Sequence, residues 1–253
     1  MPKIAFLSDI HANLHAFKAV LAEVAKAGAR QLAICGDLVG YGAHARECVE
    51  LAQKLNASCI MGNHDLWVLK VKKHGPSHFS EKWETDPVVA GLAHAASSLT
   101  LEDFSWLEQL PYAASVDGAV LVHASLDQPA AWNYVDSMAG AENSLAILRG
   151  HPRNVAFCGH NHLQRLFLDS GKELVPTADQ ETFDIPKHVA AVVAVGSVGQ
   201  SRDGDPRATW AIWDDSARTV QFRRTAYDYE GAAKAILDAG LPEASALRLL
   251  PSV

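Results

Sequence analysis

Apolar runs and helical repeats alternate along the first half of the chain, with polar turns between them. The expected elements, in order, are a strand at 3–8, a helix at 14–27, a strand at 31–35, a helix at 46–55 and a strand at 58–61. Asn13 is placed to cap the first helix, and Gly28 is placed to end it. This alternation indicates βαβ units, and hence an α/β fold with parallel strand pairing.

The segment at about 66–110 has a different pattern, in which lysines and histidines lie between large aromatic residues. Asp86 followed by Pro87 predicts the start of a helix, because Asp is a good cap and Pro fits the first helical position. Thr100, with Asp103 three residues later, predicts the start of another. We expect a helical insert that overhangs a functional site.

Short apolar or alternating runs return in the second half of the chain. They lie at 119–122, 154–158, 165–168, 189–195, 209–213 and 219–224. Short turns separate several of the last four runs, which predicts an antiparallel meander added to the parallel part, followed by a helix at 230–239. No repeat, low-complexity tract or linker is evident, so we expect a single domain over residues 1–253.

Composition and charge narrow the class of protein. The 253 residues are 49% hydrophobic and 20% charged, which is typical of a globular domain. The net charge of −7 argues against stable nucleic-acid binding. No apolar run reaches the roughly 20 residues of a membrane span. The four cysteines form no C-x-x-C pair, which favours reduced thiols and a cytoplasmic location.

Side chains that bind metals follow five of the expected strands. The segments are Ser8-Asp9-Ile10-His11, Gly36-Asp37, Gly62-Asn63-His64-Asp65, His123 and Gly159-His160-Asn161-His162. Ligands in open α/β sheets bind at the carboxyl ends of strands, so we expect these segments to meet at one rim. Each motif alone is weak evidence, whereas five in this order form a specific signature.

This mixture of ligands indicates a particular chemistry. Carboxylate, imidazole and amide groups without thiolates suit divalent Mn, Fe, Zn, Ni or Co in a catalytic site. Two such ions roughly 3.5–4 Å apart can share a carboxylate and a water, which becomes hydroxide near neutral pH. The expected reaction is therefore hydrolysis of a phosphate ester by hydroxide that bridges two metals.

The five motifs resemble those of calcineurin-like metallophosphoesterases, and segments 36–42 and 196–199 are similar to a bacterial branch of small phosphoesterases. The resemblance implies a four-layer αββα sandwich of two facing mixed sheets, with a dinuclear metal site. It implies that His64 contacts the phosphate and protonates the leaving oxygen. It also implies two metal sites with one bridging residue: the first metal on Asp9, His11 and His162, the bridge on Asp37, and the second metal on Asn63, His123 and His160.

Departures from the family pattern bear on the substrate. The protein phosphatase and diadenosine tetraphosphatase branch carries G-D-x-x-D-R-G, but here Gly40 replaces the second Asp and Tyr41 replaces the Arg. Asp65 stands where that branch has Glu. These changes argue against protein phosphatase activity. Without the Arg clamp for a dianionic phosphate, phosphodiesters are favoured over phosphomonoesters.

Three further residues are candidates for substrate binding: Asn13, Arg202 and Arg207. Asn13 also has the competing role of helix cap, and the arginines also have the competing role of surface ion pairs with nearby Asp. The expected substrate is a small phosphate ester, with nucleotide derivatives among the candidates because the aromatic residues of the insert could stack a base.

Other functions stay open at this point. The same fold also serves as a non-catalytic protein-binding scaffold, as in the phosphoesterase-like retromer subunit. Phosphomonoesterase or protein phosphatase-like activity, and hydrolysis of a non-phosphate substrate, are further alternatives. The complete ligand set and His64 favour an enzyme. The oligomeric state and the native metal are open.

Overall fold

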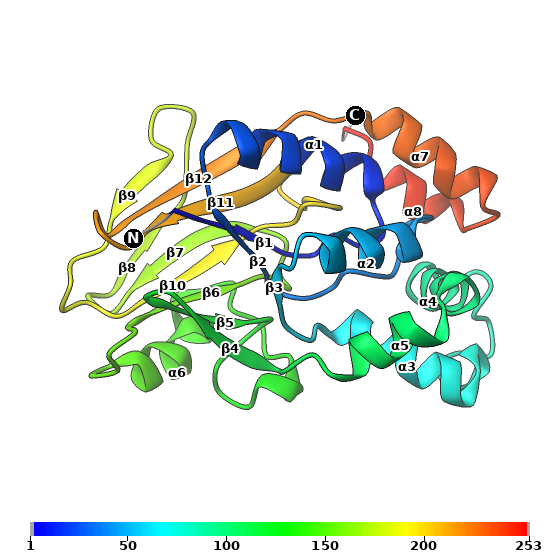
Figure 1. Cartoon of the computed structure of the whole chain (residues 1–253), viewed down its shortest axis with the longest axis horizontal. Helices are drawn as coiled ribbons and strands as arrows, with labels where there is room; N and C mark the ends of the chain where they lie inside the picture. Colours follow the sequence, from blue (N-terminus) through cyan, green and yellow to red (C-terminus); the bar gives the residue numbers. More distant parts are fainter. Residues whose placement is uncertain (1–2, 252–253) are drawn as a thin grey trace.

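Two six-stranded mixed sheets face each other in the computed structural model, which describes residues 3–251 (Figure 1). The first sheet has the order β3-β2-β1-β11-β12-β9, and the second has the order β4-β5-β6-β10-β7-β8. The strands are β1 (Ile4–Leu7), β2 (Gln31–Ile34), β3 (Ser58–Cys59), β4 (Ala113–Val116), β5 (Ala119–Val122), β6 (Val155–Cys158), β7 (Gln164–Leu168), β8 (Lys172–Leu174), β9 (Thr182–Asp184), β10 (Ala191–Val195), β11 (Ala208–Asp214) and β12 (Thr219–Thr225).

Parallel pairing is confirmed for the first half of the chain. β1 pairs in parallel with β2, and β2 with β3, through the crossover helices α1 (Leu14–Lys26) and α2 (Ala45–Lys54). The second sheet has its own parallel core, in which β6 lies between β5 and β10. Carboxyl ends of parallel strands share one edge, so these pairings determine where the polar segments meet.

The prediction of one C-terminal antiparallel meander was wrong. The hairpin of β7 and β8 lies in the second sheet with β10, whereas β9, β11 and β12 lie in the first sheet. β10 also pairs in parallel with β6. Turn residues such as Gly171, with φ +82°, favour a hairpin locally. They do not determine which sheet the hairpin joins, because that depends on packing between distant segments.

Aromatic side chains fill the space between the sheets. The rings of Phe6 on β1 and Phe157 on β6 are stacked with centroids 3.7 Å apart. β11 shows the alternation of a strand buried on both faces. Its Trp213 packs between the sheets, and its Trp210 packs toward the helices. This packing holds the two sheets face to face.

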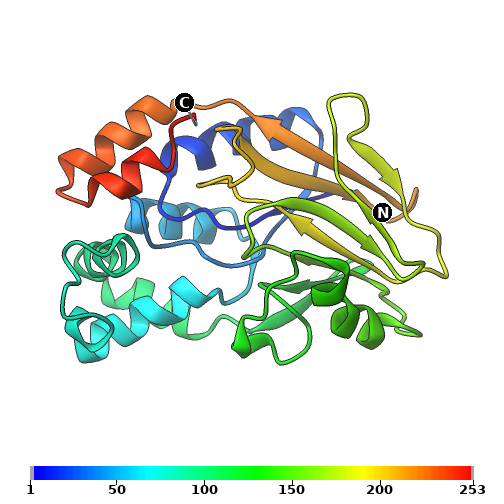
Figure 2. The ribbon, with the colours of Figure 1, turned by 180° about the vertical axis from the view of Figure 1, so that it is seen from behind.

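Helices cover both outer faces, which confirms the four-layer αββα sandwich. α1 and α2 pack on the first sheet, and α6 (Met138–Leu148) packs on the second (Figures 1 and 2). Phe17 and Val20 of α1 are fully buried in this contact. No helix among residues 3–251 combines the length and apolar character needed to cross a membrane.

The predicted insert is helical and lies at the end of the sandwich, close to α7 and α8 (Figure 2). The elements there are α3 (Asn63–His74), η1 (Pro76–His78), α4 (Pro87–Ser98), α5 (Leu101–Glu108), α7 (Tyr229–Asp238) and α8 (Glu243–Leu247). Asp86 caps α4 by accepting the amide N–H groups of Val88 and Val89, as predicted. Thr100 and Asp103 form the predicted capping box of α5. The short turn η2 (Pro129–Ala131) follows β5.

Candidate metal centre

The loops after the five predicted strands meet at one rim, where the ends of β1, β2 and β3 face those of β5 and β6. The backbone in these loops is strained. Five predicted ligands have positive φ, between 49° and 68°: Asp9, His11, Asp37, His160 and His162. Left-handed backbone in non-glycine residues costs free energy, and it clusters at functional sites where the surroundings enforce it.

The loop at 196–199 holds the first of these segments. The Ser197 hydroxyl and the Gly199 amide N–H both donate to the Asp9 carbonyl, at 2.8 and 2.9 Å. The Val198 amide N–H donates to the Ser8 carbonyl at 2.9 Å. These bonds satisfy the carbonyls of a loop that belongs to no sheet ladder, and so they stabilise the strained conformation of Asp9.

The Asp65 side chain holds the second segment, a role that the sequence reasoning missed. Its carboxylate accepts amide N–H groups from Asp37 at 2.8 Å, Leu38 at 3.0 Å and Gly62 at 3.1 Å. Burial, followed by the charge of Asp37, raises the pKa of Asp65 to about 6. Asp65 is the third residue of α3, a position where acidic residues cap helices, and that position was the available signal.

Three ligand atoms converge in a first cluster. Asp9 Oδ1 lies 3.2 Å from His162 Nε2 and 3.7 Å from His11 Nε2, and the two Nε2 atoms are 3.1 Å apart. The Nδ1 atoms of both rings face backbone carbonyls, of Val39 and Gln200. A carbonyl can only accept, so each Nδ1 carries the proton and each Nε2 presents a lone pair. Asp9 Oδ1 has no hydrogen-bond donor among the described residues. Three lone pairs that face one another fit a bound cation.

A second cluster is also built from a histidine Nε2 that faces side-chain oxygens. His123 Nδ1 donates to the Cys35 carbonyl at 2.6 Å, which leaves Nε2 to face Asn63 Oδ1 at 2.9 Å and Asp37 Oδ2 at 3.5 Å. Asp37 Oδ2 is also 3.7 Å from His11 Nε2 in the first cluster. This carboxylate therefore lies between the two groups. Its other oxygen accepts the His64 amide N–H at 2.8 Å, which fixes the orientation of the side chain.

Burial and charge set the protonation of these groups. Burial lowers the pKa of His64 to about 3, and burial followed by the charge of His123 lowers that of His160 to about 4. Burial opposes ionisation of Asp37, but the surrounding histidines, His123 first, hold its pKa below the usual range. Burial also opposes the charge on His123, but the carboxylates of Asp37 and Asp9 raise its pKa to about 9. The carboxylates thus stabilise a proton on His123, and a cation bound there would take the place of that proton, because metal ligation requires ionised carboxylates and neutral imidazoles.

His160 and His64 lie at the margin of the clusters. The ring of His160 is 5.0 Å from that of His123 and stacks on Tyr134 at 4.3 Å. It is in none of the close ligand groups among the described residues, whereas His64 forms one with His11 and Asp37. His64 Nδ1 has no hydrogen-bond partner among residues 3–251. This buried nitrogen faces Gly40, where an added β-carbon would lie 2.2 Å from it, so Nε2 is the ring nitrogen left to face a substrate.

The three candidate substrate residues differ in their surroundings. Asn13 caps α1 by accepting the Ala16 N–H, and its amide group donates to the Gly199 carbonyl at 3.0 Å. The Arg207 guanidinium is held by the Asp205 carboxylate. Both side chains therefore have partners within the chain. The backbone of Arg202 lies at the site, because its amide N–H donates to the His162 carbonyl at 3.4 Å.

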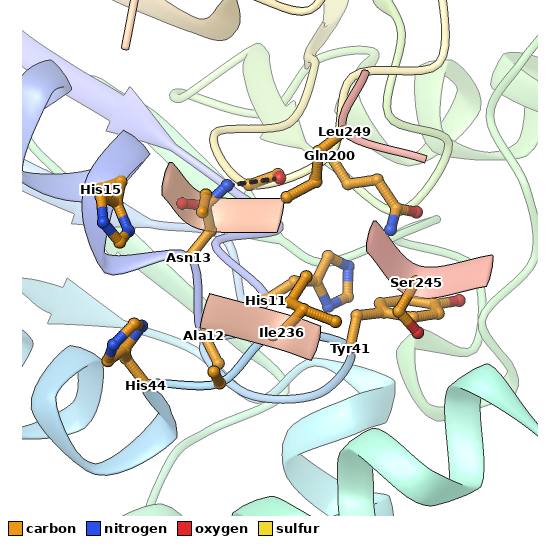
Figure 3. Close-up of a pocket in the computed structure, with 14 residues that line it drawn as sticks. His11, Ala12, Asn13, His15, Tyr41, His44, Gln200, Ile236, Ser245 and Leu249 are labelled. Atoms are coloured by element: carbon orange, nitrogen blue, oxygen red, sulfur yellow. Dashed lines mark hydrogen bonds between the residues drawn. The ribbon is translucent and has the colours of Figure 1, made fainter. Parts of the chain in front are cut away.

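A tyrosine that replaces the family arginine is part of the site, together with an arginine that the sequence reasoning missed. The ring of Tyr41 lies 4.8 Å from the rings of His11 and His64. Arg248, the residue that follows α8, places its guanidinium carbon 5.3 Å from the centre of the Tyr41 ring. Figure 3 shows Tyr41 and His11 with Ser245 of α8 around one small cavity. No local sequence signal links Arg248 to the first half of the chain.

Residues 2–164 match the family model of the calcineurin-like phosphoesterases. The chain therefore belongs to this family of phosphoesterases, and the predicted resemblance and αββα fold are confirmed. The matched region ends two residues beyond His162, so it contains every predicted metal ligand.

Individual relatives agree with this assignment. The chain is 30% identical to the uncharacterized protein MJ0912 of Methanocaldococcus jannaschii, over 95% of this chain and 94% of the relative. It is 31% identical to a symmetrical bis(5'-nucleosyl)-tetraphosphatase of Actinobacillus pleuropneumoniae, over 57% of this chain. It spans only 53% of that enzyme. The crystal structure of a metallophosphoesterase from Sphaerobacter thermophilus has a TM-score of 0.81 and 29% identity, covering 100% of this chain and 99% of that one.

Proposed function

We propose that this protein hydrolyses phosphodiesters with two divalent transition metal ions. The observation that carries the proposal is the pair of lone-pair clusters joined by Asp37, whose Oδ2 lies 3.7 Å from His11 Nε2 and 3.5 Å from His123 Nε2. Asp9, His11 and His162 would hold one ion, and Asn63 and His123 the other. His160, whose ring lies 5.0 Å from that of His123, would complete the second group. Manganese, iron, zinc, nickel and cobalt all suit these ligands.

The ions would supply an activated water and neutralise phosphoryl oxygens. The chain's own residues would orient the metal ligands and contact the substrate. Backbone carbonyls of Val39, Gln200 and Cys35 orient the three imidazoles so that each Nε2 faces the site. His64 is neutral because burial lowers its pKa to about 3, so its ring N–H would donate a hydrogen bond to a phosphate oxygen or to the leaving oxygen.

Diesters are favoured because Tyr41 occupies the place of the arginine that would clamp a dianionic monoester. A nucleotide-derived diester is the preferred substrate class, supported by the likeness to a symmetrical bis(5'-nucleosyl)-tetraphosphatase over 57% of the chain. A cytoplasmic location is part of the proposal, since all four cysteines are buried and free. The scaffold alternative is less favoured, because the ligand set and His64 are both present.

Hydrolysis of bis(p-nitrophenyl) phosphate and of p-nitrophenyl phosphate tests the proposal. The protein is stripped of metal, reconstituted with Mn, Ni, Co, Zn or Mg, and compared with an Asp37→Asn variant purified in the same way. We expect metal-dependent release from the diester, and at least tenfold less from the monoester. Equal rates for the two esters would contradict the diester preference. If metal is bound but neither ester is hydrolysed, the result would contradict the proposed phosphodiesterase activity.

A further inference from the structure

A second pocket adjoins the metal centre and shares two residues with it. The pocket has a volume of about 550 Å³, within the usual range of about 300–1,000 Å³ for small-molecule sites. Tyr41 lies at the boundary, since its ring contacts those of His11 and His64. Gln200 also belongs to both, because its carbonyl accepts a hydrogen bond from His162 Nδ1. A substrate held at the metals could therefore extend into this pocket.

Two arginines line the pocket from distant parts of the chain. Arg202 follows the 196–199 loop, and Arg248 follows α8. Both side chains are exposed, and neither forms an ion pair with a carboxylate within residues 3–251. Arg248 contacts Tyr41 instead, with its guanidinium carbon 5.3 Å from the ring centre. Two guanidinium groups without anionic partners, next to a phosphoesterase site, form a binding place for an anion.

The acidic residue of this pocket is already neutralised. Asp205 is the only carboxylate that lines the pocket among the described residues, and it accepts three hydrogen bonds from the Arg207 side chain. Arg224 Nη1 also lies 3.6 Å from Asp205 Oδ2. The charges of Arg202 and Arg248 are therefore left over to attract a negative group.

We infer that Arg202 and Arg248 bind a second, non-reacting phosphate group, so that the substrate is a nucleoside polyphosphate. Water would add to the reacting phosphorus, the phosphoanhydride P–O bond to the next phosphate would break, and two phosphorylated products would leave. This inference rests on the proposed function for the position of the reacting phosphate. The missing family arginine at position 41 is thus replaced by two arginines from the C-terminal third of the chain. They line the pocket beside the metal centre, where they would recognise the next phosphate along the substrate and not the reacting one.

Diadenosine tetraphosphate is the probe, and bis(p-nitrophenyl) phosphate, which has one phosphate, is the comparison. Arg202→Ala, Arg248→Ala and the double variant are compared with the wild type, all metal-loaded. Arg153→Ala is the matched control, because Arg153 is also exposed but precedes β6, at the opposite end of the strands. Calorimetric titration gives the Kd of diadenosine tetraphosphate whether or not it is hydrolysed. Steady-state kinetics give kcat and KM for both esters.

We expect each single variant to raise the Kd and KM for diadenosine tetraphosphate by about tenfold, since a charge-assisted hydrogen bond contributes roughly that much. The double variant should bind diadenosine tetraphosphate more weakly than either single variant. Arg248→Lys should retain part of the affinity, because lysine keeps the positive charge but lacks the planar guanidinium that donates two parallel hydrogen bonds. The KM for bis(p-nitrophenyl) phosphate, which has no second phosphate, should rise several-fold less than the KM for diadenosine tetraphosphate in every variant.

Three results would overturn the inference. They are unchanged Kd values in the double variant, no measurable binding of diadenosine tetraphosphate by the wild type, and an equal loss of activity on both esters, which would mean that the arginines act through Tyr41 on the metal centre. Failure of the proposed function gives a different result. The metal-loaded wild type would then hydrolyse neither ester, while the titration still reports on the two arginines.

Discussion

The α-carbon of Gly40 lies directly against the ring of His64. A β-carbon at position 40 would come within 2.2 Å of His64 Nδ1, and the φ of Gly40 is +92°. A side chain at position 40 would therefore displace the imidazole from the position that it has here. The room left by Gly40 lets His64 pack between Tyr41 and Trp67, with ring centroids 4.8 and 5.2 Å away.

Gly40→Ala should therefore displace His64 and lower kcat on the diester by at least about tenfold, with both metals retained. Part of the effect is backbone strain, which costs about 1–3 kcal/mol of stability at a left-handed position. Gly28→Ala is the matched control, since Gly28 has φ +71° and no atom within 4 Å of an added β-carbon. Steady-state kinetics, metal analysis and thermal unfolding of both variants separate strain from displacement. Wild-type kcat in Gly40→Ala would contradict the displacement.

Asp37→Asn should weaken both metal sites at once and abolish turnover. An amide oxygen can still accept the His64 N–H that now bonds to Asp37 Oδ1 at 2.8 Å, so the fold should persist. The lost charge removes the anion that lies between His11 and His123. Metal content by mass spectrometry, and activity after reconstitution, check this expectation. Full metal content with wild-type activity would rule out the bridging role.

His64→Ala should keep both metals and slow hydrolysis by about 10²–10⁴, the range typical of a lost general acid or base. The reason is that the His64 ring lies beside the candidate ligands, 4.7 Å from the ring of His11, where it can reach a phosphate held at the metals. Metal titration and kcat are measured on the same preparation. Loss of one metal would show instead that His64 is a ligand, as its proximity to His11 and Asp37 allows.

Metal binding should stabilise the fold, because the lone pairs of Asp9, His11 and His162 face one another without a donor. At a hundredfold excess over Kd, a ligand adds about 2.7 kcal/mol, which raises the Tm of a domain of this size by roughly 5–10 °C. Thermal unfolding is followed with chelator and with added Mn or Zn. Identical Tm values in the two conditions would argue against a preformed site.

Asp65→Ala should destabilise the fold more than it changes the chemistry. It leaves the buried amide groups of Asp37, Leu38 and Gly62 without an acceptor. Such orphaned donors cost at least about 1–3 kcal/mol. Denaturant unfolding measures the loss against Asp117→Ala, which removes an exposed carboxylate whose hydrogen bond within residues 3–251 comes from Gln31. Equal midpoints for the two variants would contradict the structural role of Asp65.

Much of the fold could be predicted because its signals are local. The cap at Asn13, the Asp86-Pro87 helix start and the capping box of Thr100 and Asp103 are satisfied by near neighbours, and the structure contains each of them. The order of the five polar segments after apolar strands depends on the same kind of local signal. The rule that parallel strands place their carboxyl ends together then indicates a common rim.

Tertiary structure alone decided the rest, because those features depend on contacts between segments far apart in the chain. Pairing of β10 with β6 and of β11 with β1 divides the C-terminal strands between the two sheets, and no turn motif encodes that choice. The short strands β4, β8 and β9 and the helix α6 were not predicted, because their patterns are brief and acquire meaning only on a sheet edge or face. The sequence by itself determined which residues could bind metals. Only the folded chain placed Asp65 beneath the Asp37 loop and Arg248 beside Tyr41, since hydrogen bonds and ring contacts require atoms within a few ångströms.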